Sequence, residues 1–179
     1  MRLSSALAVA VLFLSACAPP RPEEREIGIR LRDYSGMVET QLRVESSMLT
    51  HQVDAPVEEV WAVLPSVYGE LEISIGAFEP ETRTVGNRAF RPKRIGGALM
   101  SRYVDCGSGV TGRPKADEYQ VNMFLLTKVD PLHPDTTRVQ TEMFATAKSR
   151  EIAGNRVQCR TKGTLERRIS EMISEKVGG

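Results

Sequence analysis

The sequence predicts an α+β domain in which a curved antiparallel sheet of about six to seven strands packs on one long C-terminal helix. Apolar residues alternate along several segments, which is typical of half-buried strands. The last segment instead carries apolar residues at helical spacing. With 41% apolar and 26% charged residues, the 179-residue chain can bury a core, and its length excludes a large multidomain enzyme.

Residues 1–16 have the composition of an export signal. Arg2 supplies a positive charge, and the uncharged stretch after it, at about 14 residues, is too short to span a bilayer as a helix. The sequence Leu14-Ser15-Ala16-Cys17 resembles the lipobox of bacterial lipoproteins. That resemblance implies cleavage before Cys17, attachment of palmitate or similar acyl chains to Cys17, and stable anchoring in a membrane. The alternative is an ordinary secretory signal that happens to contain Cys17.

Residues 17–40 are expected to tether the domain to that anchor. Three prolines and alternating charges follow Cys17 and cannot build a core. Ile27, Ile29 and Leu31 then alternate, as in extended chain that leads into a strand. Ala18, rather than Asp, follows Cys17, and by resemblance this implies a cell-envelope protein of the outer membrane that faces the periplasm, if the cell is Gram-negative.

A pair of short helices is predicted directly after a first strand at 41–53. Asp54-Ala55-Pro56 supplies a capping residue and a proline near the first turn. Pro65 and Gly69 are expected to divide the helical segment into two pieces. Its apolar residues at helical spacing are Val57, Val60, Trp61 and Leu64.

The rest of the domain is predicted to consist of strands followed by one helix, and it is expected to end at residue 177. Short strands are predicted at 72–80, 83–91 and 98–106, and long strands at 119–129 and 137–148, with a turn at 131–135 between the long ones. A last strand contains Val157 and Cys159. Gly163 separates it from a helix at about 164–177. The apolar stripe of this helix is Leu165, Ile169, Met172, Ile173 and Val177.

The segment Val53-Asp54-Ala55-Pro56-Val57-Glu58-Glu59-Val60-Trp61 is similar to the opening motif of the SRPBCC, or START-like, helix-grip superfamily. In that motif an apolar residue, any residue and Ala-Pro are followed, after three residues, by Val-Trp. The strand and helix order and the terminal helix that begins Gly163-Thr164-Leu165-Glu166 agree with it. The resemblance covers residues 41–177. It implies a helix-grip fold that holds an apolar ligand between the sheet and the terminal helix.

Apolar side chains on the two faces that meet are the candidate lining of such a cavity, in which methionines would supply adaptable surface. The alternative is that the same side chains simply fill the core. The candidates are Trp61, Tyr119, Val121, Met123, Leu125, Val139, Met143, Leu165, Ile169, Met172 and Ile173.

Two thiols remain once Cys17 is acylated, those of Cys106 and Cys159. An exported location permits a disulfide between them. It would close a loop of about 50 residues and contribute roughly 4 kcal/mol. The alternatives are two free thiols, or a nucleophilic cysteine that acts with His51 or His133, for which no local motif is visible.

Charge is segregated along the chain although the total is balanced, with 24 Lys and Arg against 23 Asp and Glu. That balance argues against a nucleic-acid partner. Residues 44–82 are acidic, whereas the segment after them is basic and forms a candidate patch for anionic lipid headgroups, cell-wall polymer or an acidic protein. Arginines that keep exposed strands soluble are the alternative. The patch comprises Arg83, Arg88, Arg91, Lys93 and Arg94.

Other motifs are weak. Residues 107–112 match G-x-G-x-x-G, but Pro114 and the lack of a helical apolar period indicate a loop rather than a nucleotide site. Two histidines and three cysteines leave little material for a metal site, and no cofactor is expected.

Two functions are therefore considered. The first is a lipid-anchored envelope protein that binds an apolar small molecule or lipid in a helix-grip cavity. The second is an envelope assembly or scaffold lipoprotein that uses the domain as a protein-interaction surface. An enzyme ranks third, because no acid–base pair or nucleophile constellation is visible.

The lipobox interpretation predicts that Cys17→Ser abolishes acylation and releases the protein from the membrane fraction. Metabolic labelling with a palmitate analogue and fractionation of the envelope measure both effects. A Cys17→Ser variant that is processed normally and stays in the membrane would show that the signal is not a lipobox.

Overall fold

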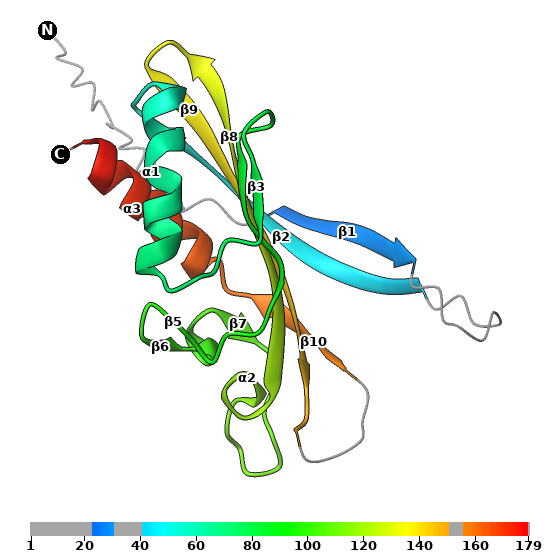
Figure 1. Cartoon of the computed structure of the whole chain (residues 1–179). Helices are drawn as coiled ribbons and strands as arrows, with labels where there is room; N and C mark the ends of the chain where they lie inside the picture. The colour runs from blue at the N-terminus through cyan, green and yellow to red at the C-terminus, as the bar shows by residue number, and fades with distance from the viewer. Residues whose placement is uncertain (1–22, 31–40, 151–155, 179) are drawn as a thin grey trace, which may run out of the picture.

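The chain folds into an open antiparallel sheet with two helices packed on one of its faces (Figure 1). The computed structural model describes residues 23–30, 41–150 and 156–178. The predicted signal at 1–16, Cys17 and most of the predicted tether lie outside the described residues. The predicted α+β class with a C-terminal helix is confirmed. Among the described residues, no helix is long and apolar enough to cross a membrane.

The sheet has eight strands, and every described pairing in it is antiparallel. Six follow the order β1-β2-β9-β8-β4-β3, while β10 pairs with both β9 and β7. A separate small hairpin consists of β5 (Arg94–Ile95) and β6 (Ala98–Leu99). The sheet strands are β1 (Glu23–Arg30), β2 (Gln41–Val53), β3 (Ala77–Glu79), β4 (Thr84–Phe90), β7 (Val104–Asp105), β8 (Gln120–His133), β9 (Thr136–Lys148) and β10 (Val157–Thr161).

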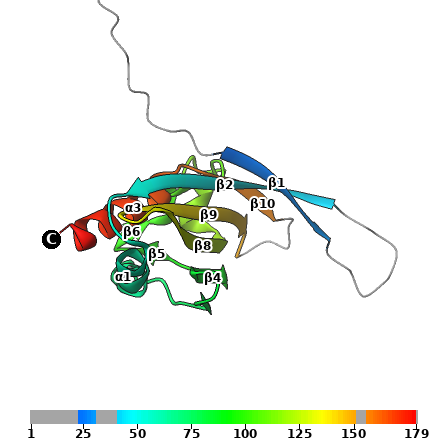
Figure 2. The same ribbon diagram turned by 90° about the horizontal axis from the view of Figure 1, so that it is seen from above.

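Strand β2 takes part in two pairings along its length. Its C-terminal part, from Ser47 to Val53, pairs with β9, and β10 continues along the same edge of β9. Its N-terminal part pairs with β1 and extends away from the helices (Figures 1 and 2). Residues 23–30, which the sequence analysis assigned to the tether and its lead-in, thus form a strand. The two alternating runs explain the register, since Ile27 lies opposite Val44 and Ile29 opposite Leu42.

Helix α1 (Val57–Glu70) is continuous, so the predicted helix pair is wrong. Pro65 lies inside it and removes one backbone hydrogen bond, at a cost of about 3 kcal/mol. Leu64, Val67 and Tyr68, on both sides of the proline, are fully buried. Burial of each such side chain contributes roughly 1.5–3 kcal/mol, so packing holds the helix together across the proline.

Two predicted short strands are also wrong in extent. Of 72–80, only β3 is a strand, because the N–H groups of Glu72 and Ile73 bond to the last turn of α1 and are not available to a sheet. The segment 98–106 is divided into β6, a 3₁₀ turn η1 (Met100–Arg102) and β7. Gly96 and Gly97, both at positive φ, close the tight β5–β6 turn that starts this irregular stretch.

The cysteines form the predicted disulfide, in which Cys106, directly after β7, is bonded to Cys159 of β10. Antiparallel pairing of β7 with β10, which places Arg160 opposite Asp105, brings the two residues together. Both sulfurs are consumed in this bond, so the alternative of a nucleophilic cysteine with His51 or His133 is excluded.

Helix α3 (Thr164–Val177) packs its apolar stripe against β2, β9 and α1. Leu165, Ile169 and Ile173 are completely buried, and Met172 is nearly so. They join the inward-facing residues of β8 and β9 in one hydrophobic core. Because α3 and α1 share one face of the sheet, this core is the layer between helices and sheet (Figure 1).

Ile169→Ala is expected to lower the free energy of unfolding by roughly 2–5 kcal/mol, because it leaves a cavity at a fully buried position. Glu171→Ala, on the exposed side of the same helix, should change it by about 0.5 kcal/mol or less. Urea denaturation of both variants measures the difference. Equally small effects would mean that α3 is not packed on the sheet.

Candidate functional site

The predicted cavity-lining residues lie together, but they pack against one another as core. Trp61 and Tyr119 are partly buried, and the other nine are buried in a single cluster. Of the eleven, only Met172 also lines the pocket described below. The nine buried residues are Val121, Met123, Leu125, Val139, Met143, Leu165, Ile169, Met172 and Ile173.

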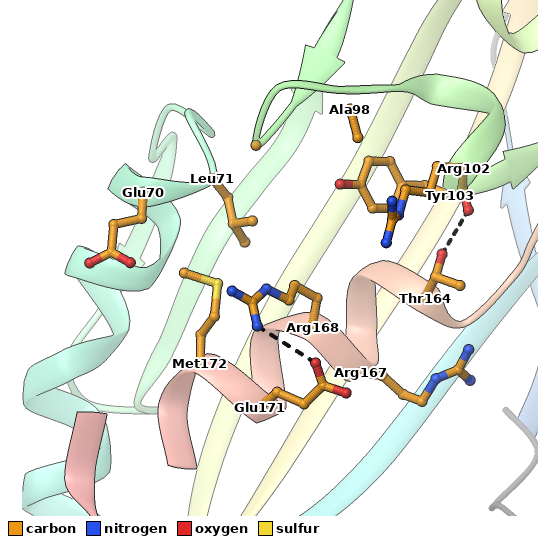
Figure 3. A pocket seen from close by; sticks show the side chains of 11 residues that line it. Glu70, Leu71, Ala98, Arg102, Tyr103, Thr164, Arg167, Arg168, Glu171 and Met172 are labelled. Atoms are coloured by element: carbon orange, nitrogen blue, oxygen red, sulfur yellow. Dashed lines mark hydrogen bonds and ion pairs between the residues drawn. The ribbon is translucent and has the colours of Figure 1, made fainter. Parts of the chain in front are cut away.

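A pocket of about 500 Å³ lies beside α3, toward the surface from this core (Figure 3). Four pieces of chain surround it: the end of α1, the β5–β6 hairpin, η1 with Tyr103, and the first half of α3. Its volume falls within the range of about 300–1,000 Å³ that is usual for small-molecule sites. The lining residues are Glu70, Leu71, Gly96, Ala98, Arg102, Tyr103, Thr164, Arg167, Arg168, Glu171 and Met172.

Backbone hydrogen bonds hold the walls of this pocket in place. On one side, the Gly96 N–H donates to the Leu71 carbonyl at 3.0 Å and the Tyr103 hydroxyl donates to the Ile95 carbonyl at 2.9 Å. These bonds dock the β5–β6 hairpin on the end of α1 and on η1. One main-chain bond and one bond from a tyrosine side chain therefore hold the hairpin wall.

The η1 wall is joined to the start of α3 in the same way. The Lys162 N–H donates to the Tyr103 carbonyl at 2.9 Å, and the Lys162 ammonium donates to the Ser101 carbonyl at 2.6 Å. The Thr164 hydroxyl donates to the Arg102 carbonyl at 2.8 Å. The carbonyls of three consecutive residues, Ser101, Arg102 and Tyr103, thus accept bonds from Lys162 and Thr164 and fix Arg102 relative to the start of α3.

The lining is amphiphilic. Leu71, Ala98, Tyr103 and Met172 form its apolar part, and Met172 points toward Leu71 across the pocket (Figure 3). Three arginines, two glutamates, Thr164 and Gly96 form the remainder. Such a surface suits a ligand with both an apolar body and a polar end.

Ion pairs neutralise part of this charge. Arg168 lies 3.7 Å from Glu171 and 3.4 Å from Glu175, and the Glu70 carboxylate bonds to Lys176. Among the described residues, no carboxylate lies within ion-pair distance of the guanidinium of Arg102. Arg102 and Arg168 project into the pocket from opposite walls (Figure 3).

A second pocket of about 330 Å³ lies on the other side of α3. His51 and Gln52 of β2 form one wall, and the polar face of α3 forms the other. Arg167 and Glu171 line both pockets, so α3 separates them. Within the part of the chain that the structure describes, no group of three or more His, Cys, Asp and Glu side chains could hold a metal ion.

Glu166 is a buried acid that the sequence analysis did not single out. Its Oε1 accepts a hydrogen bond of 2.6 Å from the Ser47 hydroxyl, which in turn accepts one from Thr161. Its Oε2 has no partner among the described residues. Burial raises the pKa of this carboxyl above its usual range, and the hydrogen bond from Ser47 opposes that shift only in part.

The predicted basic patch is interleaved with acids in the structure. Arg83 pairs with Glu58 at 2.6 Å and Arg88 with Glu79 at 2.7 Å, so the acidic and basic stretches of the sequence meet each other. Arg91 Nε donates to Asn122, and Arg94 donates to the carbonyl of Gly97. Lys93 is exposed. Two of the five cations thus already have a carboxylate partner.

The glycine-rich segment at 107–112 is a closed loop. The Gly109 N–H donates to the Arg113 carbonyl and the Lys115 N–H to that of Gly107. The helix that follows, α2 (Lys115–Glu118), has four residues. A dinucleotide site needs a long helix whose N-terminus receives the phosphates, and this segment has none.

The sequence analysis missed Arg102, Arg167 and Arg168 as site residues. On the sequence, Arg167 and Arg168 look like ordinary charges on the polar face of an amphipathic helix, and Arg102 belongs to a generally basic stretch. No periodicity distinguishes them, because contacts between η1 and α3, about 60 positions apart, bring them to one pocket.

The fold and the site together define an α+β domain whose terminal helix separates a hydrophobic core from an amphiphilic surface pocket. No known protein family matches the chain, and no curated protein is significantly similar to it.

The raised pKa of Glu166 predicts a pH dependence of stability. An acid whose pKa is higher in the folded state binds more protons there, so the free energy of unfolding falls as pH rises above the ordinary value of 4.5. Glu166→Gln has no titratable group at this position, so its free energy of unfolding does not fall with pH for this reason. It should match the wild type near pH 4.5 and be at least as stable as the wild type near pH 7.

Urea denaturation at both pH values measures the effect, and Glu171→Gln, at an exposed position of the same helix, is the control for the substitution itself. Parallel pH profiles for the wild type and Glu166→Gln would show that the Glu166 pKa is not raised.

Proposed function

We propose that the protein is a lipid-anchored cell-envelope protein that binds an amphiphilic small molecule or a lipid in the pocket beside α3. The observation that carries the proposal is the pocket of about 500 Å³ with an apolar wall of Leu71, Ala98, Tyr103 and Met172. Acylation of Cys17, by resemblance to the lipobox, would hold this pocket next to a membrane and its lipids.

The arrangement of elements is compatible with a helix-grip fold. An antiparallel sheet carries α3 across one face, and the Ala55-Pro56 motif starts α1 after β2. In a domain of this kind the ligand lies beside the terminal helix. The pocket here has that helix as one wall, but it is partly charged, whereas the sequence predicted an apolar cavity between the sheet and the helix.

A scaffold function is the second candidate, and exposed apolar side chains favour it. Trp61 of α1 stacks on Phe78 of β3 with ring centroids 5.1 Å apart, yet Phe78 remains 52% exposed. Ile75 and Leu99 are also exposed apolar residues. Exposed apolar surface next to a filled core is typical of protein-interaction domains.

Native mass spectrometry of the protein after incubation with lipids extracted from its host separates the two candidates. Ligand binding predicts a retained small molecule in the wild type that Ala98→Trp excludes, because the indole would fill the pocket. Ala62→Trp, at an exposed position of α1, is the matched control and should retain the molecule. A wild type that retains no small molecule would favour the scaffold instead.

A further inference from the structure

The strongest unassigned feature of the site is an imbalance of charge around an apolar wall. Arg102, Arg167 and Arg168 face two glutamates in the lining. The carboxylate of Glu70 is already bonded to Lys176, so it contributes little negative potential to the pocket. Glu171 in turn pairs with Arg168, so the surplus of positive charge in the lining comes from Arg102 and Arg167, which have no carboxylate partner among the described residues.

Two of the three arginines point into the pocket. Figure 3 shows that Arg102 and Arg168 extend into the pocket from facing walls, whereas Arg167 points away along the other side of α3. Arg102 has no carboxylate partner among the described residues. Its backbone is fixed to α3 through the Thr164 hydroxyl at 2.8 Å, so its guanidinium is presented from a held position.

The positive end of α3 adds to the same field. The pocket includes Thr164, at the first turn of a 14-residue helix. Gly163 precedes it and offers no side chain to cap the first N–H groups. The helix dipole therefore raises the potential where the arginines already make it positive.

From these observations we infer that the pocket selects an anionic amphiphile, whose carboxylate or phosphate lies between Arg102 and Arg168 and whose apolar chain lies against Leu71, Ala98 and Met172. This inference rests on the proposed ligand-binding function and narrows its ligand class. Guanidinium groups bind carboxylates and phosphates with strong, charge-assisted hydrogen bonds. In the absence of ligand, Glu171 and Glu175 hold Arg168, so the ligand anion replaces them.

Photoaffinity labelling of the full chain tests this inference. Three diazirine probes with the same alkyl chain are incorporated into phosphatidylcholine vesicles: dodecanoic acid in its ionised form, dodecyl phosphate and dodecanol. Labelled peptides are identified by mass spectrometry. The acid, the phosphate or both should label the peptides that contain Leu71 and Met172 about tenfold more than the alcohol does. The comparison of acid with phosphate identifies the headgroup.

Charge-removing variants assign the effect to the arginines. Arg102→Gln should lower labelling by the anionic probes about tenfold. Arg102→Lys should retain most of it, because the charge is kept. Labelling by dodecanol should stay unchanged in both variants, which shows in the same sample that the pocket is folded. Lys128→Gln, which removes a cation from β8, is the matched control and should have no effect.

Two outcomes would overturn the inference. Equal labelling by the alcohol and the anions, insensitive to Arg102→Gln, would leave the proposed ligand binding in place but remove its anionic selectivity. Absence of labelling at the pocket by all three probes would overturn both the inference and the proposed function.

Discussion

Packing of α3 against α1 and against the inward faces of β2 and β9 forms the core that positions both pockets. Leu165, Ile169 and Ile173 lose all contact with solvent there, together with Val139 and Met143 of β9. Because one side of α3 packs in this core, its charged residues Arg167, Arg168 and Glu171 lie on the remaining surface of the helix. That surface forms walls of the two pockets.

Buried polar groups accompany this packing and connect elements that are distant in sequence. Glu166 joins α3 to β2 through Ser47, and the Thr161 hydroxyl extends the contact to β10. Tyr68 of α1 bonds to Thr127 of β8 at 2.9 Å, and Thr127 bonds to Thr141 of β9. Burial raises the pKa of Tyr68, so this hydroxyl stays neutral and acts only as a hydrogen-bonding group. Both networks lie between helix and sheet, where an unpaired polar group would be costly.

The disulfide connects two of the segments that form the pocket. Cys159 lies in β10, which leads directly into α3, and Cys106 follows β7, which η1 precedes. The covalent bond therefore joins the strand that positions α3 to the segment that carries Arg102 and Tyr103. Hydrogen bonds from Lys162 and Thr164 to η1 reinforce the same connection. The two walls that present Arg102 and Arg168 are thus joined by a covalent bond and by hydrogen bonds.

Local periodicity and the small number of cysteines were enough to predict several features of the fold. Alternation located β2, β8 and β9, helical spacing located α3, and the two cysteines outside the predicted signal and lipobox predicted the disulfide. Tertiary packing determined the continuity of α1 and the position of the pocket. Pro65 is tolerated in α1 because its neighbours are buried, which local propensity does not record. The predicted cavity residues became core, and the pocket formed instead where the β5–β6 hairpin, η1 and α3 meet. No sequence pattern predicts this pocket, because the segments that form it are tens of residues apart. Their charged residues cannot be distinguished in the sequence from charges on any solvent-exposed surface.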